Sequence, residues 1–158
     1  MVCHGAQVAW GAHPFRVRHS VDSAGRPLLL CRTDGALDRT LRPVDGESDT
    51  AAVLCVAAAV PVRGAKVWVS GWVEPLNGDE ARAAALEFAA VNPLSDLLGI
   101  GSGQTLYRMD VAEVRLECPA GHLREIDPVD YAAAEPLPVA VGGSPGLTAV
   151  VEPNEPVM

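Results

Sequence analysis

The pattern of hydrophobic and polar positions is clearest between residues 66 and 117, where it predicts a strand, a helix and a second strand. Residues 66–76 alternate between tryptophan and valine positions, as a half-buried strand does. Residues 79–93 repeat their apolar side chains at intervals of three and four, which favours a helix that ends at its Asn-Pro pair. Alternation returns at residues 105–117. This order of elements is typical of an α+β protein.

Earlier in the chain, the same pattern predicts a β-hairpin and a buried strand. Residues 15–21 alternate, residues 22–25 form a turn, and residues 27–32 return as a second strand. The continuous apolar run at residues 51–59 is bounded by turn residues, which indicates a central strand covered on both faces.

A short helix is expected between the hairpin and this central strand. Leu37 and Leu41 stand one helical turn apart and predict its buried face. Asp38 and Arg42 have the same spacing, so the two side chains are placed to form an ion pair.

The connections between these elements are short, so the predicted fold is α+β: a mainly antiparallel β-barrel of about six strands with one or two helices. We expect this barrel domain to cover residues 13–131. Residues 1–12 are expected to be an irregular N-terminal segment. Residues 132–158 are rich in proline and glycine without periodicity, which predicts a flexible tail.

The charge of the chain restricts its partners. With 20 acidic and 12 basic residues, its net charge is −8, which argues against binding to nucleic acid or to an anionic membrane. No run supplies the roughly 20 apolar residues of a membrane span. The start of the chain lacks the pattern of a signal peptide. We therefore expect a cytoplasmic protein.

The cysteines do not have the spacing of a metal site. They are Cys3, Cys31, Cys55 and Cys118. Cys31 and Cys55 lie in apolar runs and are expected to be buried. Cys118 and His122 could offer two ligands, but the paired arrangement of a four-ligand zinc site is missing. No metal site is therefore predicted.

Four segments of the chain resemble the split β-barrel superfamily of flavin-binding, pyridoxamine-phosphate-oxidase-like proteins, in the branch related to haem-utilisation split-barrel proteins. They are PLLLCRTDGALDRTLRP (27–43), KVWVSGWVEPL (66–76), TLYRMDVAEVRLE (105–117) and REIDPVDYAAAEP (124–136). The resemblance covers roughly residues 13 to 136. It implies a split barrel that forms a homodimer, with FMN or a deazaflavin bound at the dimer interface.

The resemblance also implies where the cofactor phosphate would be held: at the end of the early strand and in the helix that follows. The matching positions are Arg32, Thr33 and Arg39. A phosphate needs fixed cations and hydroxyl or backbone donors, which this segment can supply. In the alternative interpretation, Thr33 or Asp34 caps the helix and the two arginines are solvated.

The function implied by the resemblance is that of a flavin- or deazaflavin-dependent oxidoreductase that transfers hydride to a small conjugated substrate. Trp68 or Trp72 could form a wall of the ring site, and otherwise belongs to the core. No acid–base pair in the sequence identifies catalytic residues. The alternative is a non-catalytic haem- or partner-binding barrel that has lost flavin, with His19 or His122 as candidate haem ligand. A third hypothesis is a purely structural dimer.

Overall fold

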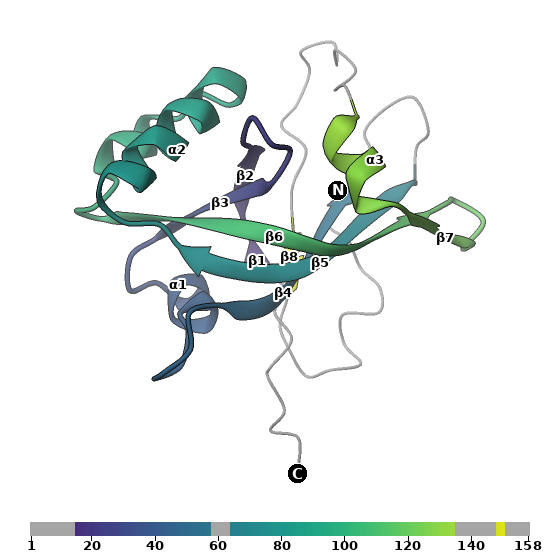
Figure 1. Cartoon of the computed structure of the whole chain (residues 1–158), viewed down its shortest axis with the longest axis horizontal. Helices are drawn as coiled ribbons and strands as arrows, with labels where there is room; N and C mark the ends of the chain where they lie inside the picture. Colours follow the sequence, from purple (N-terminus) through teal and green to yellow (C-terminus); the bar gives the residue numbers. More distant parts are fainter. Residues whose placement is uncertain (1–14, 58–63, 135–147, 151–158) are drawn as a thin grey trace.

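The computed structural model describes residues 15–57, 64–134 and 148–150 (Figure 1). Their elements are β1 (Phe15–Arg16), β2 (Arg18–Val21), β3 (Pro27–Arg32), α1 (Ala36–Leu41), β4 (Thr50–Ala57), β5 (Lys66–Pro75), α2 (Gly78–Val91), the 3-10 helix η2 (Ser95–Gly99), β6 (Gln104–Glu117), β7 (Leu123–Ile126), α3 (Pro128–Ala133) and β8 (Thr148–Val150). The predicted α+β class is confirmed. Three α-helices are present in the described residues, where one or two were expected.

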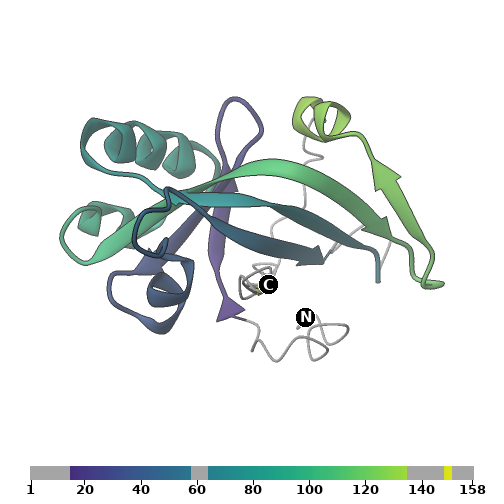
Figure 2. The same ribbon diagram turned by 60° about the horizontal axis from the view of Figure 1, so that its bottom comes forward.

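All of these strands belong to one antiparallel sheet, in the order β1-β8-β4-β5-β6-β3-β2, with β7 added beside β6. The two ends of this order are consecutive in the chain, because only Val17 separates β1 from β2. β1 pairs with β8, whereas β2 pairs with β3. The sheet therefore curls until its two edge strands, β1 and β2, follow each other in the chain. Within the described residues, no hydrogen bonds between β1 and β2 close the sheet into a complete barrel. Figure 2 shows the curvature of β4, β5 and β6. This open, curled sheet agrees with the predicted split barrel.

The inner face of the sheet forms the main hydrophobic core. On β5, Val69 and Val73 are completely buried and lie opposite Val114 and Met109 of β6, which are buried as well. Trp72 points to the other face and remains 47% exposed, so the interpretation that placed it in the core is wrong. The alternation predicted for this strand is confirmed by its inward valines.

A second core lies on the outer face, where α2 covers β3 and β6 (Figure 1). Leu28 and Leu30 point outward from β3 and pack with Phe88 of α2, while Leu29 between them belongs to the inner core. β3 is therefore buried on both faces, as its unbroken apolar sequence requires. The helix ends at Val91, directly before the predicted Asn-Pro pair, and Asn92 is its C-cap, with the Asn92 N–H donating to Phe88 O at 2.8 Å.

A bulge allows β5 and β6 to stay paired along this curvature. The register shifts between Ser70 and Gly71, so that Ala112 of β6 has no partner. A Cβ atom on Gly71 would lie 2.0 Å from Asp110 O, so only glycine permits this close approach. A bulge increases the local twist of a sheet, which favours the curl of the barrel.

The C-terminal segment 132–158 contributes one element that its sequence did not indicate. β8 lies within it and pairs with both β4 and β1, so it links these strands in the sheet. The rest of this expected tail beyond residue 134, and the N-terminal segment 1–12, lie outside the described residues. Among the helices that the structure describes, none has the length and apolar character needed to cross a membrane.

Candidate functional site

The turn between β3 and α1 is tightly held. The Gly35 N–H donates to Arg32 O at 3.0 Å, and Asp34 between them adopts a left-handed conformation with φ of 59°. The Thr33 N–H donates to Gly103 O at 3.0 Å, which joins the turn to the loop before β6. Backbone hydrogen bonds thus fix the turn on both sides.

The buried carboxylate of Asp38 also holds this turn in place. Asp38 is 1% exposed and accepts hydrogen bonds from Tyr107 Oη at 2.6 Å, the Asp34 N–H at 2.8 Å and Arg42 Nη2 at 2.5 Å. Burial raises the pKa of Asp38, but these hydrogen bonds outweigh it and hold that pKa below its ordinary value. Burial and the bond to Asp38 raise the pKa of Tyr107. The predicted ion pair of Asp38 with Arg42 is confirmed.

The three expected phosphate ligands lie at the junction of this turn and α1. Arg32 is the last residue of β3. The Arg39 N–H donates to Gly35 O, so Arg39 lies one helical turn beyond the end of the β3–α1 connection. Both arginine side chains are exposed, and neither has an ion-pair partner among the residues that the structure describes. Thr33 is half-buried, with its hydroxyl 2.8 Å from Thr105 Oγ1. The structure therefore places the three residues within one short segment.

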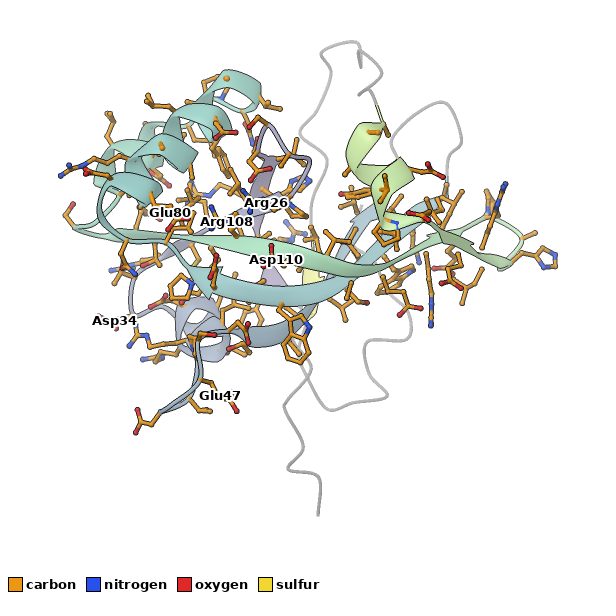
Figure 3. The ribbon with its side chains drawn as sticks, in the orientation of Figure 1. Arg26, Asp34, Glu47, Glu80, Arg108 and Asp110 are labelled. Atoms are coloured by element: carbon orange, nitrogen blue, oxygen red, sulfur yellow. The ribbon has the colours of Figure 1, made fainter. Side chains whose placement is uncertain are left out.

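The acidic residues of this segment are occupied by another arginine. Arg42 Nη2 donates to Asp34 Oδ1 at 2.8 Å as well as to Asp38. Asp34 lies at the outer side of the turn beside α1 (Figure 3). Residues 32–42 carry three arginines and two aspartates, a net charge of 3 − 2 = +1 in a chain of net charge −8. This turn is thus locally cationic.

The alternative interpretation of the turn is partly wrong. Neither Thr33 nor Asp34 caps α1, because the N-cap is Gly35 and no side chain caps it. The side chains of Thr33 and Asp34 bond to Thr105 and Arg42 instead. The arginines are exposed, as that interpretation assumed.

The two candidate ring walls lie elsewhere on the sheet. Trp68 Nε1 donates to Glu117 Oε2 at 2.8 Å, and its side chain is half-buried. Along β6, the partner of Trp72 stands six residues from the partner of Arg32, a separation of roughly 20 Å. One chain therefore does not bring Trp72 next to the phosphate turn.

The histidines do not form a metal site in the described residues. His19 lies opposite Leu29, and its buried Nδ1 has no hydrogen-bond partner there. This burial lowers the pKa of His19 to about 4. His122 is exposed in the turn between β6 and β7. Within the part of the chain that the structure describes, no group of three or more His, Cys, Asp or Glu residues could hold a metal ion.

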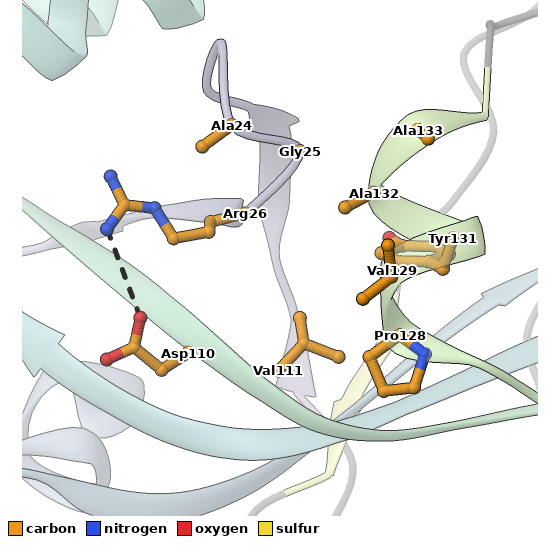
Figure 4. A pocket seen from close by; sticks show the side chains of 10 residues that line it. All are labelled: Ala24, Gly25, Arg26, Asp110, Val111, Pro128, Val129, Tyr131, Ala132 and Ala133. Atoms are coloured by element: carbon orange, nitrogen blue, oxygen red, sulfur yellow. Dashed lines mark ion pairs between the residues drawn. The ribbon is translucent and has the colours of Figure 1, made fainter.

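A pocket that the sequence did not indicate lies at the other end of β3 (Figure 4). It has a volume of about 540 Å³ and lies between the β2–β3 hairpin, β6 and α3. Arg26 and Asp110 face each other at one side, whereas α3 supplies an apolar wall. The Asp-Ser-Ala-Gly-Arg turn was visible in the sequence, but nothing in it indicated that β6 and α3 meet there.

These features define a class of protein: an α+β open antiparallel barrel with a cationic turn and a separate apolar pocket. No protein-family model and no curated protein matches this sequence.

Proposed function

We propose that this protein is a flavin- or deazaflavin-binding oxidoreductase that transfers hydride to a small conjugated substrate. One observation carries the proposal: Arg32 and Arg39, both exposed and without ion-pair partners in the described residues, stand with the Thr33 hydroxyl at a turn fixed by buried Asp38. Guanidinium groups bind phosphate through charge-assisted hydrogen bonds. The flavin supplies the redox chemistry when it is bound, and the protein supplies binding and orientation.

Each residue of the turn has a distinct part in holding the phosphate. Arg32 and Arg39 donate to the phosphate oxygens through their guanidinium groups. Thr33 shares one hydrogen bond with Thr105, and when Thr105 is the donor the Thr33 proton is available to the phosphate. Asp38 does not contact the phosphate, but its bond to the Asp34 N–H keeps the turn in shape before the cofactor arrives.

The proposal includes a homodimer with the cofactor at its interface, in the cytoplasm. The separation of Trp72 from Arg32 supports a second copy as the source of the ring wall, because one chain does not bring the indole to the phosphate turn. Trp72 is 47% exposed and thus accessible to a partner chain or to a ring. Trp68 is less suited, since its indole N–H already bonds to Glu117.

The experiment compares ligands that differ only in the phosphate. FMN and riboflavin are titrated into the purified protein, and absorption and fluorescence give both dissociation constants. We expect FMN to bind at least about tenfold more tightly, since one hydrogen bond to a charged group contributes roughly 1.5–3 kcal/mol. The double variant Arg32→Gln/Arg39→Gln should bind FMN at least about tenfold more weakly than the unchanged protein does, with its affinity for riboflavin unaltered. Arg124→Gln is the control, because Arg124 of β7 is also exposed and lacks an ion-pair partner in the described part of the chain.

A deazaflavin with a phosphate-bearing side chain and haem are titrated in parallel. Binding of the deazaflavin that depends on the same two arginines supports the proposal. A haem Soret shift without binding of either flavin-type cofactor would replace it with the haem-binding alternative. No binding of any of the three would contradict the proposal.

A further inference from the structure

The pocket at the Arg26 end of β3 has walls of unequal chemistry (Figure 4). One side is apolar and consists of Val111, Pro128, Val129 and Tyr131. The opposite side carries the charged pair of Arg26 and Asp110. Its volume of about 540 Å³ lies within the range of roughly 300–1,000 Å³ that is usual for small-molecule sites.

Arg26 is held in place by a buried carboxylate. The side chain of Asp22 is 5% exposed and accepts hydrogen bonds from Arg26 Nε at 2.8 Å, the Arg26 N–H at 2.9 Å and the Ala24 N–H at 3.0 Å. These bonds fix the guanidinium group by its Nε side. One terminal nitrogen, Nη1, is directed toward Asp110, as Figure 4 shows.

The charged pair in the pocket is open rather than closed. Arg26 Nη1 lies 4.0 Å from Asp110 Oδ1, which is an ion-pair distance but too long for a hydrogen bond. The Asp110 side chain is 68% exposed and the Arg26 side chain 38% exposed. A donor for Asp110 and an acceptor for Arg26 can therefore be offered by one ligand.

The local charge restricts what that ligand can be. Arg26 and Asp110 are the two charged residues of the lining, and the buried Asp22 behind Arg26 already offsets part of the arginine's positive charge. A ligand with only a carboxylate would be repelled by the exposed carboxylate of Asp110. A ligand with an ammonium group beside its carboxylate satisfies Asp110 and Arg26 together, and an apolar side chain fits the wall formed by α3.

The close contact between the hairpin and α3 keeps this wall in place. A Cβ atom on Gly25 would lie 2.7 Å from both Cα and O of Ala132, and Gly25 has φ of 77°. Only glycine combines this conformation with so close an approach. The two sides of the pocket are therefore held at a fixed separation.

We propose that this pocket binds a small zwitterion with an apolar side chain, of the kind that a hydrophobic α-amino acid presents. Its carboxylate binds Arg26, its ammonium group binds Asp110, and its side chain packs against Val129 and Tyr131. The site is independent of the cofactor turn, because Arg26 and Arg32 stand six residues apart at opposite ends of β3, roughly 20 Å from each other.

The test titrates L-phenylalanine and L-leucine into the flavin-free, full-length protein by isothermal calorimetry. Three comparison ligands each remove one feature: N-acetyl-L-phenylalanine lacks the ammonium group, L-phenylalaninamide lacks the carboxylate, and glycine lacks the side chain. We expect each to bind at least about tenfold more weakly than L-phenylalanine, because each leaves one part of the pocket unmatched. Equal binding of N-acetyl-L-phenylalanine, or no binding of either amino acid, would overturn the proposal.

Substitutions in and outside the pocket test whether L-phenylalanine binds there. Asp110→Asn should weaken binding of L-phenylalanine about tenfold. Because the Asp110 side chain is exposed, this substitution should leave the fold intact. Glu113→Gln is the matched control on the same strand, outside the pocket lining, and should bind as the unchanged protein does. The variant Arg32→Gln/Arg39→Gln should also bind normally, so failure of the flavin proposal and failure of this one give different results. Amide shifts in NMR spectra on adding L-phenylalanine should centre on α3 and the hairpin, and shifts centred elsewhere would contradict the assignment.

Discussion

The two ends of β3 are built with the same device but present different surfaces. At each end, a buried aspartate accepts hydrogen bonds from the backbone of a turn and from an arginine: Asp38 with Arg42 at one end, and Asp22 with Arg26 at the other. A buried carboxylate that is fully hydrogen-bonded fixes a turn without leaving an unsatisfied group.

The difference lies in where the arginine points. At the Asp38 end, Arg42 turns back to two carboxylates, and this leaves Arg32 and Arg39 exposed. At the Asp22 end, Arg26 itself faces the pocket. The same arrangement of turn and carboxylate thus offers exposed arginines at one end of β3 and an open ion pair at the other, which is why we assign them different ligands.

The largest expected effect is the loss of the deeper carboxylate. Asp38→Ala should lower the free energy of unfolding by about 3–4 kcal/mol, because it removes three hydrogen bonds and leaves the buried Tyr107 hydroxyl without its main partner. Urea unfolding measures this change. Asp79→Ala is the control, since that carboxylate is 98% exposed and pairs only with Arg82 among the described residues. Equal effects of the two substitutions would contradict a structural role of Asp38.

Between the two ends, His19 lies opposite Leu29 in the middle of β3 and should make stability depend on pH. Its pKa is about 4 in the folded protein and about 6.5 when unfolded, so the unfolded chain binds more protons between these values. Stability is therefore complete above pH 6.5 and falls by about 2–3 kcal/mol as the pH drops toward 4. Urea unfolding at several pH values should show this slope, and His19→Gln should flatten it. The same slope in the variant would assign it to other groups.

Asp38 should act in a lower pH range than His19. The pKa of Asp38 is held below its ordinary value, so its contribution is present above the pKa of the unfolded carboxyl and is lost as the pH falls through the folded pKa. The slope between pH 6.5 and 4 should consequently remain in Asp38→Asn.

The carboxylate at the pocket end should matter less for stability. Asp22→Ala should lower the free energy of unfolding by about 2 kcal/mol, because the hairpin turn loses three hydrogen bonds that are only partly buried and lie outside the main core. Amide hydrogen exchange should accelerate at Ala24 and Arg26 and remain slow at the β3–α1 turn. Faster exchange at both turns would show that the two ends are coupled.

The smallest expected change in stability concerns the free arginines. Arg32→Gln/Arg39→Gln should alter the free energy of unfolding by less than about 0.5 kcal/mol, since neither side chain has an ion pair within the described residues. The thermal unfolding midpoint measures this. A large loss of stability would mean that these arginines support the fold, and their exposure would then not indicate a ligand site.

Local patterns were sufficient for most of the elements. Alternation located β5 and β6, and a spacing of four residues located the pair of Asp38 with Arg42. Both depend only on the geometry of one strand or one helix.

Contacts between distant segments could not be predicted in this way. The bond from Tyr107 to Asp38 joins residues 69 positions apart and depends on the register of β3 against β6. The pocket needs three elements that local periodicity does not place together. β8 is a three-residue strand in a segment rich in proline and glycine. It is a strand because it pairs with β4 and β1, and its own sequence has no strand pattern.

The central claim is that the β3–α1 turn binds a cofactor phosphate, and the most direct measurement is the ratio of the riboflavin and FMN dissociation constants. Our account predicts a ratio of at least about ten for the unchanged protein and for Arg124→Gln, and a ratio at least about tenfold lower for Arg32→Gln/Arg39→Gln. Equal affinities for FMN and riboflavin in the unchanged protein, or a ratio that survives in the double variant, would contradict it.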